Sequence, residues 1–124
     1  MARLKLIKAS SEFYFALDQI IGVRKVQEDS FAYVVDLEVN GKNCDLFCLA
    51  DGMGGHAAGD LASKIVIESS ISHIKSSEKA NISRILFDAA TMSNRAIAKK
   101  IKGNIKLEGM GSTLILSIIN ENNF

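Results

Sequence analysis

Apolar residues along the chain follow a strand-like pattern in four short segments. Runs rich in aromatic and β-branched residues predict strands at 13–20, 31–39 and 44–50. A fourth run at 112–119 is almost continuously apolar, which is typical of a strand buried on both faces.

Apolar residues recur at three-to-four spacing between these runs, over 57–74 and 82–101, and this spacing predicts two helices. Asn81 is placed to cap the second helix at its start, and Gly103 to follow its end. The order of strands, two helices and a final strand predicts an α+β fold with an antiparallel sheet.

A turn signal stands between the second and third predicted strands. Asn40-Gly41 separates two apolar runs, and both residue types accept positive φ, so a β-hairpin is expected. The loop could exceed two residues, because Lys42 and Asn43 are poor strand formers.

The end of the sequence leaves the predicted sheet without a partner strand. After Ile119 only Asn120 to Phe124 remain, and a buried last strand would then have an unpaired edge and exposed apolar surface. We therefore expect residues 1–124 to form one truncated domain.

Composition is that of a globular protein and excludes several classes. Hydrophobic residues make up 48% and charged residues 23%, and the net charge of +1 gives no footprint for nucleic acid. No run is long and apolar enough for a membrane span, and no signal peptide is evident. Cys44 and Cys48 share a strand face but lie too far apart to bridge, which favours reduced thiols in a cytoplasmic protein.

Acidic residues gather where the predicted hairpin closes. Glu28 and Asp29 open the strand at 31–39, and Asp51 ends the strand at 44–50. Pairing of the strands would bring these carboxylates to one end of the sheet, where they repel unless a cation neutralises them or they take up protons. Oxygen ligands without a set of His or Cys favour Mg²⁺ or Mn²⁺ over zinc.

Glycines and an arginine surround these carboxylates. The segment from Asp51 to Gly55 holds three glycines, which allow a sharp turn from strand to helix and let a carbonyl such as that of Gly52 approach a metal. Arg24 offers a planar fork for two phosphate oxygens. Taken singly, each feature is also common as a solvated surface residue or a plain turn, so only their combination suggests a site.

A dinucleotide-binding loop is the competing interpretation of the same glycines. Gly52, Gly54 and Ala57 satisfy the spacing of that fingerprint. Asp51, however, would place a carboxylate where the pyrophosphate binds, and the stretch 69–73 falls in a predicted helix where an acidic residue should end a second parallel strand. Charge and topology both disfavour this reading.

Three segments together resemble the protein phosphatase 2C family of metal-dependent serine/threonine phosphatases, in its bacterial form. They are GVRKVQED at 22–29, LADGMGGHAAGDLAS at 49–63 and GMGSTL at 109–114, and the middle one is highly specific. The resemblance covers nearly the whole chain and about the N-terminal half of the family's domain. It implies half of an αββα sandwich, two Mn²⁺ or Mg²⁺ ions in the complete domain, and phosphorylated serine/threonine proteins as partners, with a cognate kinase possible.

The resemblance also implies roles for individual residues. Asp51 is similar to the ligand shared by two metals, the carbonyl of Gly52 binds one of them, and Glu28 binds the second directly or through water. Asp29 matches an aspartate that orders metal-bound water, and Arg24 matches the residue that holds the substrate phosphate. Thr113, from the third segment, is interpreted as structural.

The implied chemistry is attack on phosphorus by a metal-activated water, without a covalent phospho-enzyme. Met53 stands where many eukaryotic members carry a proton-donating histidine. His56 could substitute, although a solvent-exposed histidine at the helix start is the plainer reading.

The later metal ligands of the family are absent from these residues, which leaves two hypotheses. The chain derives from a working phosphatase, or it is an inert fragment or a phosphatase-like binding scaffold. In either case residues 1–124 alone are expected to show little or no activity.

Overall fold

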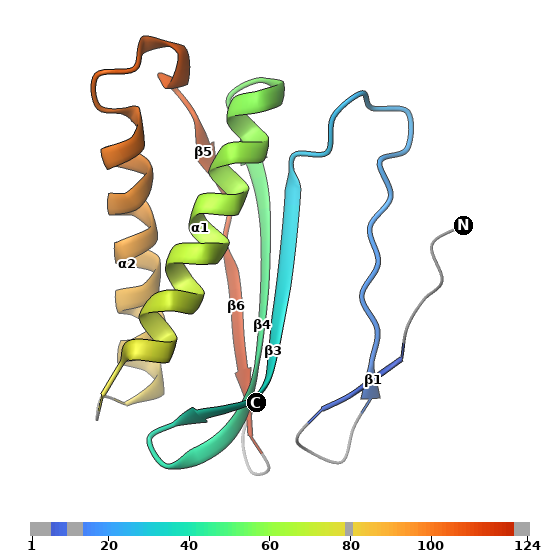
Figure 1. Cartoon of the computed structure of the whole chain (residues 1–124), viewed down its shortest axis with the longest axis vertical. Helices are drawn as coiled ribbons and strands as arrows, with labels where there is room; N and C mark the ends of the chain where they lie inside the picture. The colour runs from blue at the N-terminus through green and yellow to red at the C-terminus, as the bar shows by residue number, and fades with distance from the viewer. Residues whose placement is uncertain (1–5, 10–13, 79–80, 121–124) are drawn as a thin grey trace.

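The computed structural model describes residues 6–9, 14–78 and 81–120. Helix α1 lies on one face of an antiparallel sheet and α2 packs against α1 (Figure 1), which confirms the predicted α+β class. The elements in chain order are β1 (Ile7–Lys8), β2 (Tyr14–Phe15), β3 (Asp29–Val39), β4 (Lys42–Met53), α1 (His56–Ser76), α2 (Ile82–Ile101), a 3₁₀ turn (Ile105–Leu107), β5 (Gly111–Ser112) and β6 (Ile115–Ile119).

The central feature is the long hairpin of β3 and β4. Val39 pairs with Lys42, so the loop is only Asn40-Gly41, and both residues adopt positive φ, 53° and 74°. The longer loop considered from the sequence is therefore wrong, because Lys42 and Asn43 join the ladder. A third positive φ in the hairpin, 54° at Asp36, lies at a break in register between Val34 and Leu37.

The predicted last strand is broken in two. β5 pairs with the end of β4 through Gly52 and Met53, while β6 pairs with its middle. Thr113 and Leu114 lie between them, outside either strand. Ile115 is 60% exposed, so the expectation of burial on both faces is wrong for the described residues.

The predicted first strand at 13–20 is mostly wrong. Only Tyr14 and Phe15 form a strand, and residues 16–20 run on without a ladder partner; Phe13 lies outside the described residues. β1, which pairs with β2, was not predicted.

Both helices agree with the sequence pattern. α2 has the predicted bounds, the Asn81 side chain accepts the backbone N–H of Arg84 at 2.7 Å, and Gly103 adopts φ 77° just beyond the C-cap. α1 is longer than predicted by one residue at its start and two at its end. No helix in the described part of the chain is long and apolar enough to cross a lipid bilayer.

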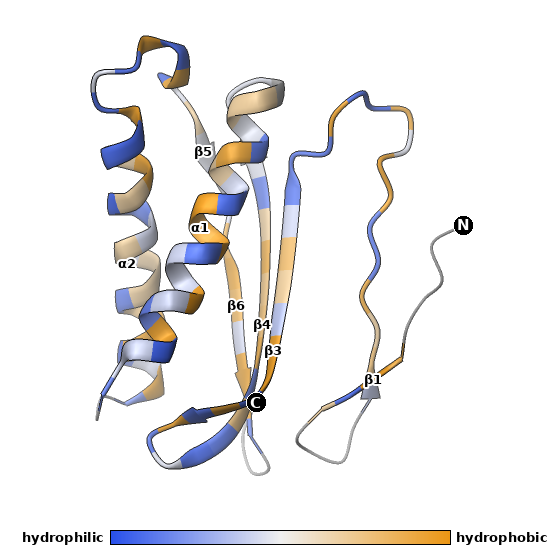
Figure 2. Ribbon diagram, in the orientation of Figure 1, coloured by the Kyte–Doolittle hydropathy of each residue, from blue (hydrophilic) through white to orange (hydrophobic). Residues whose placement is uncertain are grey.

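The core lies between the sheet and α1. Alternate residues of β4, Leu46, Cys48 and Ala50, are buried against α1 residues such as Ala62 and Val66. Figure 2 shows hydrophobic residues along β4 and β6. Both cysteines are buried and free, which confirms that Cys44 and Cys48 do not form a disulfide.

The opposite face of the sheet carries aromatic residues. The Phe15 ring meets the rings of Tyr33 and Phe47 edge to face, with centroids 5.1 and 4.6 Å apart. Leu49 and Ile115 on neighbouring strands remain exposed. The described residues thus give one covered and one partly open sheet face.

Candidate active site

Strand register brings the predicted carboxylates to one end of the sheet. Asp29 of β3 is the ladder partner of Asp51 of β4, so their side chains share a face. Just beyond this pair, the backbone N–H of Gly52 donates to the carbonyl of Glu28 at 3.1 Å. The sequence prediction that Glu28, Asp29 and Asp51 come together at one end of the sheet is therefore confirmed.

Asp29 shows the electrostatic cost of this arrangement. Partial desolvation raises the pKa of Asp29 above its usual value, and the neighbouring Asp51 carboxylate raises it further. The Arg24 guanidinium acts in the opposite direction. A cation placed between Asp29 and Asp51 would relieve their repulsion.

Glu28 lies on the helix side of this end. Its side chain is only 17% exposed, and its carboxylate is 4.0 Å from the guanidinium of Arg24, which is 75% exposed. Arg24, Lys25, Glu28 and Gly55 line a cavity of 370 Å³ beside the start of α1. An anionic group in this cavity would meet the cationic side chains of Arg24 and Lys25 as well as the Glu28 carboxylate.

Close backbone packing explains why position 52 is glycine. A Cβ on Gly52 would lie 1.9 Å from the carbonyl oxygen of Gly59 in α1 and 2.9 Å from that of Glu28. The sharp turn itself is made by Gly54 and Gly55, with φ of 125° and 78°. Gly52 is therefore required by contact with α1, whereas the turn depends on the two glycines that follow.

The segment after β5 holds Asp51 from the other side. The Thr113 hydroxyl accepts the backbone N–H of Asp51, and the Thr113 N–H donates to the Asp51 carbonyl, both at 2.9 Å. Thr113 thus fixes the backbone of a proposed ligand, a role that its assignment to a strand did not reveal. The only sequence signal was that Asp51 and Thr113 each lie in a segment that resembles the same family.

The donor set fits a hard divalent cation in chemistry but is incomplete in number. Carboxylates of Glu28, Asp29 and Asp51 and the carbonyl of Gly52 are oxygen ligands of the kind that Mg²⁺ and Mn²⁺ prefer. Among residues 6–9, 14–78 and 81–120, however, no three His, Cys, Asp or Glu side chains are grouped so that they could hold one ion. The described residues therefore do not form a complete metal site by themselves.

Part of the chain is similar in sequence to a bacterial serine/threonine phosphatase. No protein-family model matches the sequence. The serine/threonine protein phosphatase PstP of Mycobacterium tuberculosis is 46% identical over 70 residues, which are 56% of this chain and 13% of the relative. The chain therefore spans a small part of the curated relative that it matches.

Solved structures extend the similarity. The M. tuberculosis PstP structure has 37% identity and a TM-score of 0.62, and the match covers 81% of this chain and 39% of that one. A PstP catalytic domain in complex with two manganese ions gives 35% identity and a TM-score of 0.63, over 81% and 40%. Stp1 of Staphylococcus aureus gives 27% and 0.66, over 81% and 39%.

The motifs, the strand pairing at their junction and these matches lead to the same family. The chain is homologous, over about four fifths of its length, to part of the catalytic domain of bacterial phosphatase 2C-type serine/threonine phosphatases.

Proposed function

We propose that this chain supplies one side of the active site of a metal-dependent phosphatase acting on phosphoserine and phosphothreonine in proteins. The observation that carries the proposal is the pairing of Asp29 with Asp51, with Glu28 and Gly52 hydrogen-bonded beside them. Homology to a catalytic domain that binds two manganese ions supports the same chemistry.

Each residue at this end has a proposed task. Asp51, Glu28 and the carbonyl of Gly52 are the oxygen donors for Mn²⁺ or Mg²⁺, and Asp29 accepts a hydrogen bond from water near them. Arg24 binds the substrate phosphate, because its exposed guanidinium borders a cavity and can donate to two phosphate oxygens.

The reaction is hydrolysis of a phosphate monoester. Two bound divalent cations would lower the pKa of a water and stabilise charge on the phosphoryl group. Arg24 would orient the phosphate for in-line attack, and Asp29 would orient the water. Met53 cannot donate a proton to the leaving alkoxide, so water or another group must do so.

The partners proposed are phosphorylated proteins, and a serine/threonine kinase that makes them is a natural counterpart. The family of PstP supports the class of substrate only, through its name as a serine/threonine protein phosphatase. A cytoplasmic location stays a prediction from the two reduced cysteines.

A segment exchange tests the proposal without depending on what surrounds this chain. The matched segment of the M. tuberculosis PstP catalytic domain is replaced by this chain, and Mn²⁺-dependent hydrolysis of a phosphothreonine peptide is measured. We expect turnover that falls at least 100-fold with Asp51→Asn, since loss of a bridging ligand removes charge stabilisation of a few kcal/mol. Asp88→Asn, on the outer side of α2, is the matched control and should change little.

A non-catalytic scaffold is the second candidate. The observation in its favour is that the described residues contain no complete group of metal-binding side chains. A folded exchange protein without Mn²⁺-dependent turnover would favour this scaffold. Turnover that persists in Asp51→Asn would contradict the role given to Asp51.

A further inference from the structure

Glycine at position 59 is unexpected from local helix energetics. Gly59 lies in the first turns of α1, where glycine is less favourable than alanine. A glycine within a helix usually has a packing reason. The surroundings of Gly59 provide one.

The missing Cβ of Gly59 would point at two proposed oxygen donors. It would lie 3.0 Å from the carboxyl carbon of Glu28, 3.1 Å from its Oε1 and 3.1 Å from the carbonyl oxygen of Gly52. Distances this short are rare for real Cβ atoms, so the neighbours would have to move by a few tenths of an ångström. The Glu28 side chain is flexible, but the Gly52 carbonyl belongs to the backbone of β4.

The contact is reciprocal, since the Gly59 carbonyl fills the place of a Cβ on Gly52. Strand and helix backbones therefore touch at a pair of glycines, and this pair sets how closely α1 approaches the sheet end. The hydrogen bond between Ser30 and Ser63, 2.8 Å apart, holds the next turn of α1 to β3. This hydrogen bond restrains α1, so the helix cannot move away from the sheet at Gly59 without straining it.

We propose that Gly59 is a positioning residue. Its lack of a side chain leaves room for the Glu28 carboxylate and the Gly52 carbonyl at their observed positions at the edge of the site. The inference deepens the proposed function and rests on it for the meaning of these two oxygens. The packing claim itself is independent of any metal.

Stability and local hydrogen exchange of Gly59→Ala test this role in the 124-residue chain. If position 59 were open, alanine would raise the urea midpoint of unfolding. We expect the midpoint to fall instead. Ser72→Ala and Ser72→Gly, at an exposed position of α1, form the matched control, and there the alanine variant should have the higher midpoint.

Amide exchange locates the effect. The Gly52 N–H, bonded to the Glu28 carbonyl, should exchange at least tenfold faster in Gly59→Ala, while the Thr113 N–H, bonded to Asp51, should keep its rate. A raised urea midpoint or an unchanged Gly52 rate would overturn the proposal.

A second background isolates the Glu28 contact. Glu28→Ala removes the carboxylate that the new Cβ would meet, so Gly59→Ala should cost less stability in that background. If Gly59→Ala does not fold alone, a folded double variant supports the role given to Glu28, and an unfolded one beside folded Glu28→Ala overturns that role. An equal loss in both backgrounds also overturns the role of Glu28, because the Gly52 carbonyl would then account for the whole cost.

A titration with Mn²⁺ alone keeps the two proposals apart. Mn²⁺ should broaden the amide signals near Glu28 and Gly52 in the wild-type chain. The Gly59→Ala variant should need a higher Mn²⁺ concentration for the same broadening. Absence of Mn²⁺ binding by wild type counts against the proposed function, and the exchange rates then decide the role of Gly59.

Discussion

Single residues at the site are held by groups distant in the sequence. The backbone of Asp51 is hydrogen-bonded on both sides by Thr113, 62 residues later. Sequence reasoning identified Asp51 from its neighbours in the chain, but it interpreted Thr113 as part of a strand. The hydroxyl contact depends on β5 pairing with β4, which no local pattern reports.

Removing the Thr113 hydroxyl should weaken this end of the sheet. Thr113→Val keeps the shape but leaves the Asp51 N–H without its acceptor, and we expect a loss of about 1 kcal/mol in the free energy of unfolding. Thr113→Ser retains the hydroxyl and serves as the control. Urea unfolding of both variants measures the difference, and equal stability of the two would contradict the contact.

Cys48 should make the protein sensitive to alkaline pH. Burial raises the pKa of its thiol from 9.0 to about 11, so the unfolded chain loses this proton first. This stabilising effect is fully present below pH 9 and is lost between pH 9 and pH 11. The loss in the free energy of unfolding reaches about 1 kcal/mol by pH 10. Urea unfolding at pH 8 and pH 10 should show that loss in wild type and a smaller one in Cys48→Ala. The same slope in both would exclude Cys48 as its source.

Elements with strong local signals were predictable, and those set by pairing were not. Asn40-Gly41 fixed the hairpin and Asn81 fixed the start of α2, because turn and cap preferences are properties of a few adjacent residues. The break at Thr113 depends on the long-range pairing of β5 and β6 with β4. The two-residue strand β1 pairs with β2 only six to eight residues later, but it is too short to give a sequence signal.

The cap of α2 should contribute measurably to stability. Asn81→Ala removes the acceptor of the Arg84 N–H at 2.7 Å and should cost about 1 kcal/mol. Asn81→Asp keeps an acceptor and should restore most of it. Thermal unfolding compares the three chains, and an unchanged Tm in Asn81→Ala would show that the cap is not needed.

The junction of β4 and α1 should tolerate no side chain at position 52. Gly52→Ala would drive a Cβ into the Gly59 carbonyl, so we expect destabilisation of about 3 kcal/mol or more. Gly111→Ala on the neighbouring β5 is the control, because its Cβ would meet only Met53 at an ordinary 3.6 Å. Urea midpoints give both values, and similar losses at the two positions would refute the close contact.

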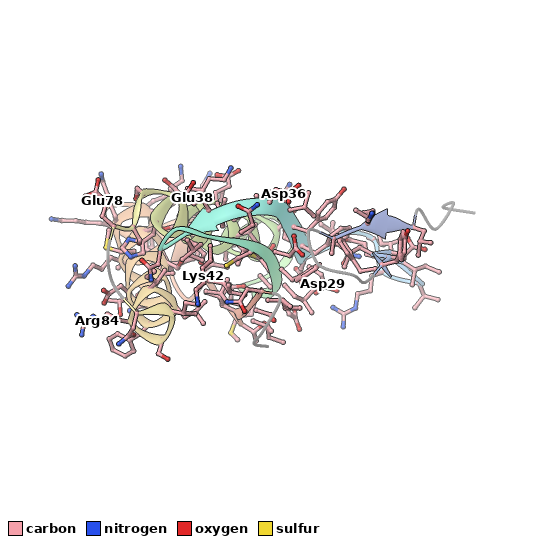
Figure 3. All side chains as sticks on the ribbon, turned by 90° about the horizontal axis from the view of Figure 1, so that it is seen from below. Asp29, Asp36, Glu38, Lys42, Glu78 and Arg84 are labelled. Carbon is pink, nitrogen blue, oxygen red and sulfur yellow. The ribbon has the colours of Figure 1, made fainter. Side chains whose placement is uncertain are left out.

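At the scale of the whole molecule, charged residues lie at both ends of the hairpin, as well as along the helices. The candidate site lies where β3 begins, and a second charged region, with Glu38, Lys42 and Glu78, lies at the hairpin end from which Figure 3 is viewed. Glu38 and Glu78 line a cavity of 830 Å³ there. The family assignment was predictable from three motifs, whereas the contact of Thr113 with Asp51 was not, since it depends on residues that converge in space.

Metal binding is proposed at the end of the sheet that carries Asp51. The most direct test is a map of Mn²⁺-induced broadening of backbone amide signals in the ¹⁵N-labelled chain, compared with Asp51→Asn. We predict that the amides of Glu28, Asp29 and Gly52 broaden first and that Asp51→Asn removes this effect. Broadening that begins at Glu38 and Glu78, or that is the same in Asp51→Asn, would contradict the account.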